Sequence, residues 1–166
     1  MTEDRGLLVD WRAVFRAWLI AGTVYFILDL LVVPAILGGT FWISARLVAS
    51  ILLGSEVLAP PATFHGPALV AAVLTVYGLA LLATVVIALV IHRGGLILGI
   101  FGGALLGLSF YAINYYSLTY FFPQFFALNA PAVVISHVIF GALAGGVYEW
   151  LEDDELERAQ GEHGSG

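Results

Sequence analysis

The sequence contains no cysteine and no lysine, and it carries little charge of either sign. The absence of cysteine excludes disulfides, thiolate metal sites, iron–sulfur ligation by thiolates, covalent haem attachment and thiol catalysis. Only 11% of the 166 residues are charged, whereas about a quarter is usual for a soluble chain. Hydrophobic residues make up 61%, more than a soluble domain of this length could bury. The composition therefore predicts a multi-pass membrane protein.

Motifs of catalysis and nucleotide binding are also missing. The sequence has no H-E-x-x-H, no G-x-S-x-G and no Walker lysine, which would mark zinc proteases, serine hydrolases and P-loop enzymes. The net charge of −6 argues against nucleic acid as a partner. We therefore expect no enzyme activity.

Four apolar runs are each close to the roughly 20 residues that cross a hydrocarbon core about 30 Å thick. They lie at about 13–33, 67–91, 95–118 and 132–151. Pro34 follows the first run, and Pro131 precedes the last. We predict an all-α fold with four transmembrane helices in one domain, residues 1–152, followed by an acidic cytoplasmic tail, residues 153–166.

Residues 35–58 form a fifth apolar segment of ambiguous type. Arg46 lies at its centre, where a charge costs about 2.5–3.5 kcal/mol on insertion scales. A glycine pair precedes a short helix expected at about 42–53, and Pro60-Pro61 follows it. We interpret this segment as an interfacial or re-entrant helix in preference to a fifth span.

The arginines indicate the orientation, because arginines that flank spans favour the cytoplasmic side. With four spans, Arg46 is the only arginine on its side of the membrane. The other five arginines fall together on the opposite side: Arg5, Arg12, Arg16, Arg93 and Arg158. Both termini are therefore expected in the cytoplasm.

Glycines recur at every fourth position in the third run and again in the fourth. In water each interior glycine would cost about 1 kcal/mol relative to alanine, but in lipid small residues let helices approach closely. The third and fourth helices are therefore expected to pack through one glycine-lined face each. The residues concerned are Gly95, Gly99, Gly103, Gly107, Gly141 and Gly145.

Polar residues within membrane segments are candidates for function. Five are expected near the outer side: Asp29, Arg46, His65, Asn114 and His137. Asn114 and His137 continue the glycine faces of their helices, so both should face the bundle interior. In one interpretation Asp29 pairs with Arg46, while Asn114 and His137 bond across helices. In the other, the cluster forms a proton or ion path or an outer ligand pocket.

Histidine pairs offer little prospect of a haem site. His92 and His137 are expected on the order of 20 Å apart along the membrane normal, at about 1.5 Å per helical residue, too far for one haem. His65 with His137 is left as a geometric alternative. The acidic residues between 153 and 157 are expected to form a solvated helix end instead of a metal site. We expect no cofactor and no metal.

Three stretches carry a resemblance: RLVASILLGSEVLAPPATFHG from Arg46, INYYSLTYFFP and SHVIFGALAGGVYE. The loop from Pro60 to Phe64, the pair Asn114-Tyr115 and His137 resemble features of a family of small uncharacterised bacterial four-span membrane proteins. The resemblance covers roughly residues 20–150 and implies a bacterial inner membrane and no established activity. Some members carry an automatic label of sodium:proline symporter. Such transporters use about ten spans in inverted repeats, which four spans cannot supply.

Our leading hypothesis for function is a non-catalytic subunit or accessory protein of a larger bacterial membrane complex, of a respiratory or other energy-transducing kind. Its partners would be the lipid bilayer and other integral membrane subunits or further copies of itself. The alternative is a homo-oligomeric channel or small transporter that uses the outer polar cluster. A third hypothesis is a quinone- or lipid-binding protein that uses Tyr115, Tyr116 and His137.

Overall fold

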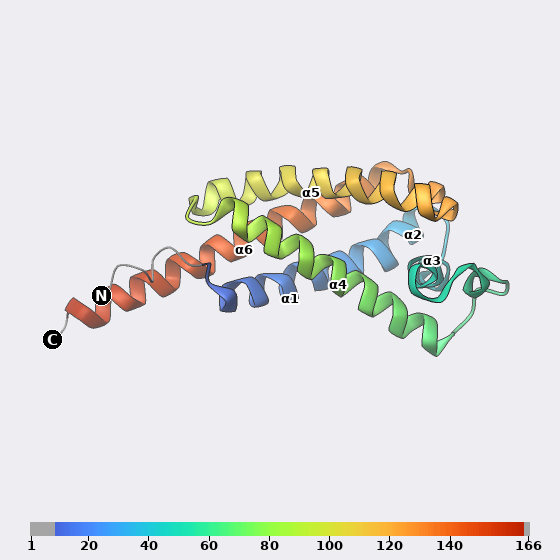
Figure 1. Ribbon diagram of the computed structural model, residues 1–166, viewed down its shortest axis with the longest axis horizontal. Coiled ribbons are helices and arrows are strands. Elements are labelled where there is room, and N and C mark those ends of the chain that lie inside the picture. The colour runs from blue at the N-terminus through green and yellow to red at the C-terminus, as the bar shows by residue number, and fades with distance from the viewer. Residues whose placement is uncertain (1–8, 165–166) are drawn as a thin grey trace.

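The computed structural model describes residues 9–164, with the side chains of 127 and 153–164 left undescribed. This part of the chain is helical and contains no strand. Four of its helices are long and apolar enough to cross a membrane, and a shorter apolar helix accompanies them (Figure 1). The predicted fold class, an all-α membrane protein with four long helices and one short helix, is thus confirmed.

The first long helix is a composite of α1 (Trp11–Ile27), a π-helical turn η2 (Leu28–Val32) and α2 (Val33–Ile36). It begins at Asp10, whose Oδ1 accepts a 2.8 Å hydrogen bond from the Arg12 N–H. From the sequence we expected the first helix to end before Pro34. In the structure it continues through Pro34 to Ile36. Proline lacks an N–H and its ring crowds the preceding turn. The wider π turn lies immediately before it, and there the helix accommodates the proline.

The short helix α3 (Phe41–Leu53) confirms the one expected at about 42–53. Its 13 residues give a length of about 20 Å at 1.5 Å per residue, too short to cross a membrane. Figure 1 shows α3 nearly end-on while the long helices run across the page, so α3 lies across one end of the bundle. It packs against α4 (Gly66–Ile91), and buried alanines such as Ala45 and Ala49 belong to that packing.

The last two long helices form a hairpin, α5 (Gly95–Phe121) and α6 (Pro131–Gly164). A tight turn at 92–94 joins α4 to α5, and the 3-10 turn η4 (Pro123–Leu128) lies between α5 and α6. Another 3-10 turn, η3 (Ser55–Leu58), follows α3. The acidic residues after 152 continue α6 as helix.

Glycine brings α5 and α6 into backbone contact. A Cβ atom added at Gly103 would meet the carbonyl oxygen of Gly141, and one added at Gly145 would meet that of Gly99. At Gly107 it would meet the carbonyl oxygen of His137. The sixth glycine of the expected set, Gly95, differs, because its φ is +78° and open space surrounds the place of a Cβ.

The buried core has two parts, one toward each end of the bundle. The tail end, where Asp10, the α4–α5 turn and the C-terminal half of α6 lie, is filled by side chains of α1, α4 and α6 such as Ala17, Ile87 and Tyr148. The α3 end is filled by side chains of α3, α4 and η2 such as Leu30. Figure 1 shows α4 and α5 diverging toward the α3 end.

Candidate functional site

A cavity of about 80 Å³ lies where the four long helices meet α3 and η4. An ordered water needs about 10–15 Å³ on this measure, so the cavity has room for about five to eight waters. Leu79 of α4 belongs to its lining and is 41% exposed. The cavity is partly open to the surface of the bundle, and the space inside is that of a small molecule.

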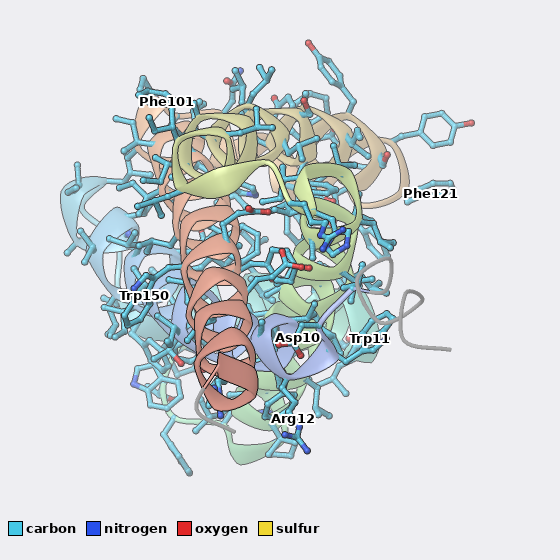
Figure 2. The ribbon with its side chains drawn as sticks, turned by 90° about the vertical axis from the view of Figure 1, so that its left-hand side faces the viewer. Asp10, Trp11, Arg12, Phe101, Phe121 and Trp150 are labelled. Atoms are coloured by element: carbon cyan, nitrogen blue, oxygen red, sulfur yellow. The ribbon has the colours of Figure 1, made fainter. Side chains whose placement is uncertain are left out.

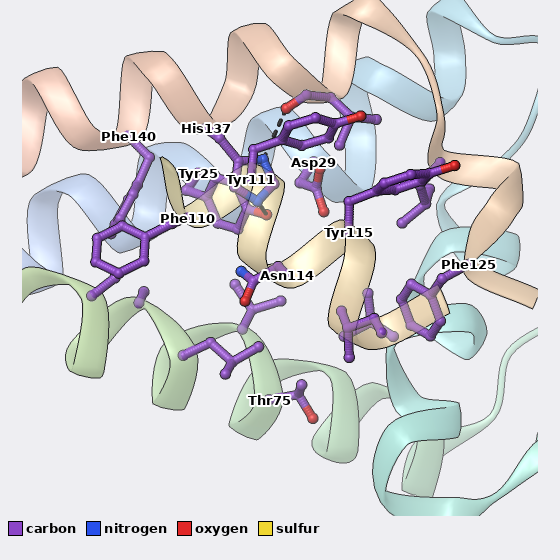
Figure 3. Close-up of a pocket in the computed structure, with 18 of the residues that line it drawn as sticks. Tyr25, Asp29, Thr75, Phe110, Tyr111, Asn114, Tyr115, Phe125, His137 and Phe140 are labelled. Atoms are coloured by element: carbon purple, nitrogen blue, oxygen red, sulfur yellow. Dashed lines mark hydrogen bonds between the residues drawn. The ribbon is translucent and has the colours of Figure 1, made fainter. Parts of the chain in front are cut away.

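Asp29 brings a carboxyl group to this cavity from the π-helical turn of the first span (Figure 3). Its side chain is only 9% exposed. The Ser136 hydroxyl lies 3.4 Å from Asp29 Oδ1, but it also lies 2.9 Å from the Val133 carbonyl oxygen. A hydroxyl has one proton to donate, so Ser136 supports Asp29 weakly. Single π-helical turns within α-helices are frequent at functional sites.

His137 reaches the same cavity from α6. Its Nδ1 lies 2.8 Å from the Val133 carbonyl oxygen, and because a carbonyl only accepts, Nδ1 must carry a proton. Its Nε2 lies 3.1 Å from the Tyr25 hydroxyl, which donates to it when the ring is neutral. Tyr25 also makes a hydrogen-bonding contact with Asp29, and because its hydroxyl has one proton, it donates either to His137 Nε2 or to the Asp29 carboxylate. Tyr25 thus links the two titratable side chains of the cavity.

Asn114 supplies an amide group from α5. Figure 3 shows its side chain directed into the space between α5 and α4. Among the described residues, no side chain or backbone group hydrogen-bonds with this carboxamide. An amide inside a membrane protein normally finds such a partner, because leaving it unpaired costs free energy. Asn114 is therefore positioned to hydrogen-bond with a molecule in the cavity.

Aromatic rings form one continuous wall of the cavity. Going from ring to ring, the centroids of Phe140 and Tyr25 are 5.4 Å apart, those of Tyr25 and His137 5.0 Å, and those of His137 and Tyr111 5.5 Å. Tyr115 continues the series by stacking on Tyr111 at 5.7 Å. A mostly apolar, aromatic lining with a few convergent polar groups is the usual character of a small-molecule site.

Arg46 and His65, expected in the same cluster, lie elsewhere. The Arg46 guanidinium donates to the carbonyl oxygens of Val57, Ala59 and Thr63, at 3.3, 2.9 and 3.0 Å. His65 precedes α4, and its Nδ1 accepts from the Ala68 N–H at 3.1 Å. The expected ion pair between Asp29 and Arg46 is wrong: the described part of the chain contains no ion pair of Asp29. The loop 54–65 offers unpaired carbonyls nearer to Arg46, and these engage the guanidinium instead.

Two important residues of the cavity escaped the sequence reasoning, Tyr25 and Tyr111. Tyr25 precedes Asp29 by four residues, and Tyr111 precedes Asn114 by three. Residues three or four apart share one face of a helix, so this spacing was a usable signal. Tyrosines near a membrane boundary are common as interfacial anchors. For that reason the sequence alone did not indicate that these two tyrosines line a cavity.

A second group of titratable side chains lies at the tail end, the end that faces the viewer in Figure 2. His92 Nδ1 is 2.8 Å from Glu152 Oε1 and 2.9 Å from the Tyr148 hydroxyl. Glu149 Oε2 accepts a hydrogen bond from the Gly95 N–H. In the described part of the chain, no group of three or more acidic or histidine side chains is arranged to hold a metal. These contacts tie the α4–α5 turn to α6.

No family model, curated protein or solved structure matches this chain.

Proposed function

We propose that this chain is a non-catalytic bacterial inner-membrane protein that binds a small molecule in the cavity, as a homo-oligomeric small transporter. One observation carries the proposal. Asp29, Asn114 and His137 come from three different spans and all line the same cavity. When three polar side chains from within the spans meet in one cavity, ligand binding explains their position better than helix packing does.

The hydrogen bonding around the cavity supports a ligand over a purely structural cluster. A structural cluster would satisfy its own polar groups, because each unpaired one is costly in a membrane. Here Asn114 has no partner among the described residues. Asp29 shares both of its hydroxyl partners with other acceptors, Ser136 with the Val133 carbonyl oxygen and Tyr25 with His137 Nε2. The cluster is thus incomplete by itself, and a bound molecule would complete it.

The packing of the core supports the homo-oligomeric part of the proposal. Side chains of α1, α4 and α6 fill the tail end of the bundle, so one copy encloses a cavity and no continuous path. Passage across the membrane then requires a second copy or a movement of the helices. Arg12 and Arg93 lie at the tail end, which the positive-inside rule assigns to the cytoplasm together with both termini. The cavity accordingly lies in the outer half of the membrane.

Cysteine labelling tests access to the cavity, because the natural chain has no thiol. Thr75→Cys places one thiol in the cavity lining. Gly78→Cys is the comparison variant outside the cavity. It places a thiol on an open part of the α4 surface, where no atom lies within 4 Å of an added Cβ. We expect the Thr75→Cys protein in detergent to react with methyl methanethiosulfonate, and a second change that fills the cavity, Ala83→Phe, to slow the reaction at least tenfold. A Thr75→Cys thiol that stays unreactive while Ser55→Cys in the exposed η3 turn reacts would refute the proposal.

The surface of α5 favours a second candidate, an accessory subunit of a larger membrane complex. In its most apolar stretch only 17% of the residues are buried, against 28% to 50% in the other three spans. Its rings at Tyr116, Tyr120 and Phe121 are at least 70% exposed. This face would suit another integral subunit, for example of a respiratory or other energy-transducing complex.

Gentle extraction from the native membrane separates these two candidates. Native-gel separation followed by mass spectrometry would show which proteins migrate with the chain. Stoichiometric co-migration with larger proteins would support an accessory subunit. Migration as a homo-oligomer alone would support the small transporter.

A further inference from the structure

We infer that the cavity takes a small organic cation, such as a quaternary ammonium compound, held by the Asp29 carboxylate and the surrounding aromatic rings. The inference rests on the proposed function and adds the chemical class of the ligand. It follows from three properties of the cavity: its acidic side chain, its aromatic lining and its size.

The cavity contains one acidic side chain, Asp29, and among the described residues Asp29 forms no ion pair. Asp29 is nine-tenths buried, and a buried carboxylate without a positive partner costs several kcal/mol. The basic groups that pack around it do not fill this role. Arg46 of α3 is bound to loop carbonyls, and the ring nitrogens of His137 of α6 contact Tyr25 and the Val133 carbonyl oxygen in place of Asp29. A cationic ligand would supply the missing charge, whereas an anionic one would be repelled.

The aromatic lining suits a cation that cannot donate hydrogen bonds. A quaternary ammonium group is attracted to the negative face of an aromatic ring within about 6 Å of its centroid, and more strongly when water is excluded. Tyr25, Tyr111 and Tyr115 line the same cavity as Asp29, and Phe110 and Phe140 complete the wall. Carboxylate and rings together therefore match a soft organic cation better than a hydrated metal ion, which needs several oxygen ligands.

The size and the free amide narrow the class further. Room for about five to eight waters corresponds to roughly 150–240 Å³ of liquid volume, which excludes large polycyclic cations. Asn114 offers both an amide donor and an acceptor to the cavity. A small quaternary ammonium compound with a hydroxyl group, such as choline, would use the charge, the rings and the amide at once.

Three probes of the same shape and different charge test the inference. Choline is positive, 3,3-dimethyl-1-butanol is its neutral carbon analogue, and 3,3-dimethylbutanoate is a negative counterpart. The measurement is how well each probe protects the full-length Thr75→Cys protein from methyl methanethiosulfonate. We expect choline to protect at a concentration at least tenfold lower than the neutral analogue, and the anion to give no protection.

Two further variants assign the effect to residues. With Asp29→Asn added, choline should lose its advantage while the neutral analogue protects as before, which also shows that the variant is folded. Tyr111→Leu should weaken protection by choline several-fold, whereas Tyr111→Phe, which keeps the ring, should not.

Each remaining outcome overturns a defined part of the argument. Equal protection by choline and the neutral analogue, or an advantage of choline that survives Asp29→Asn, would overturn the cation while leaving a binding cavity. A reactive thiol that none of the probes protects would overturn the cation as well. A thiol that never reacts would overturn the proposed function with it.

Discussion

The Glu149 carboxylate on α6 accepts a 2.6 Å hydrogen bond from the backbone N–H of Gly95, the first residue of α5. The residue before this helix, Gly94, has no side chain to cap it, so the cap comes from a different helix. The first N–H groups of a helix lack intrahelical partners and carry a partial positive charge. Glu149 is fully buried and therefore fixes the start of α5 against α6.

This contact leads to a prediction about stability. Removing a charged hydrogen-bond partner and leaving the donor unsatisfied costs about 1–3 kcal/mol when the donor is buried. The Gly95 N–H is part-buried, so Glu149→Ala should lower the free energy of unfolding by about 1 kcal/mol, the lower end of that range. Glu149→Gln keeps an oxygen that can accept from Gly95 and should lose less. Thermal unfolding of both variants in the same detergent gives the ranking. Wild-type stability in the alanine variant would show that the cap contributes nothing.

A second prediction concerns the backbone contact of α5 with α6. Gly103→Leu would force a side chain against the Gly141 carbonyl, and overpacking costs typically 1–3 kcal/mol and occasionally more. The matched control is Gly78→Leu on α4, where an added Cβ has nothing within 4 Å. We expect Gly103→Leu to lower the melting temperature more than either Gly78→Leu or His137→Ala. The reverse ranking would mean that the glycines do not set this helix spacing.

A third prediction separates Arg46 from the cavity. Because its guanidinium binds the carbonyls of Val57, Ala59 and Thr63, Arg46→Met should loosen the loop 54–65 and raise its proteolysis or hydrogen exchange. Its effect on stability should add to that of Asp29→Asn within about 0.5 kcal/mol, as for residues without a shared partner. A double-mutant cycle measures this sum. A coupling energy well above that value would contradict the structure and indicate an ion pair between Arg46 and Asp29.

The sequence predicted the spans well because apolar length is a local property. The runs at 67–91 and 95–118 fall within α4 and α5, and Arg46 with its flanking glycines and prolines indicated that α3 is a short helix. The rotation of a helix about its axis was harder to predict. The positions of the glycines predicted that Asn114 and His137 face the bundle interior, and both do line the cavity.

Partners and local irregularities could not be read from the sequence. Arg46 and Asp29 were expected at similar depth, but which acceptor Arg46 reaches depends on the path of the loop 54–65. The π-helical turn at Leu28–Val32 has no clear sequence signal apart from the following Pro34, and it determines where Asp29 points. The aromatic wall depends on how four helices are rotated relative to one another, which no single helix encodes.

A fourth prediction asks whether Asp29 serves the fold or a ligand. A carboxylate that stabilised the fold would have a basic partner, and its replacement by asparagine would leave that partner unpaired and cost about 3–5 kcal/mol. In the described residues Asp29 has no such partner, and Asn keeps its shape without the charge. The ligand-free Asp29→Asn protein should therefore be as stable as the wild type, or more stable by about 1 kcal/mol, which is roughly 2–4 °C in Tm for a chain of this size.

The control for this prediction is Ser136→Ala, which removes the weak 3.4 Å contact of Asp29 and leaves the charge. If the buried charge is the destabilising element, Ser136→Ala should lower Tm while Asp29→Asn does not. A loss of several kcal/mol in Asp29→Asn would instead make the carboxylate part of the structural framework. Retained stability would mean that the chain keeps a buried acidic side chain that its own fold does not need, and such a side chain is what a cation-binding site requires.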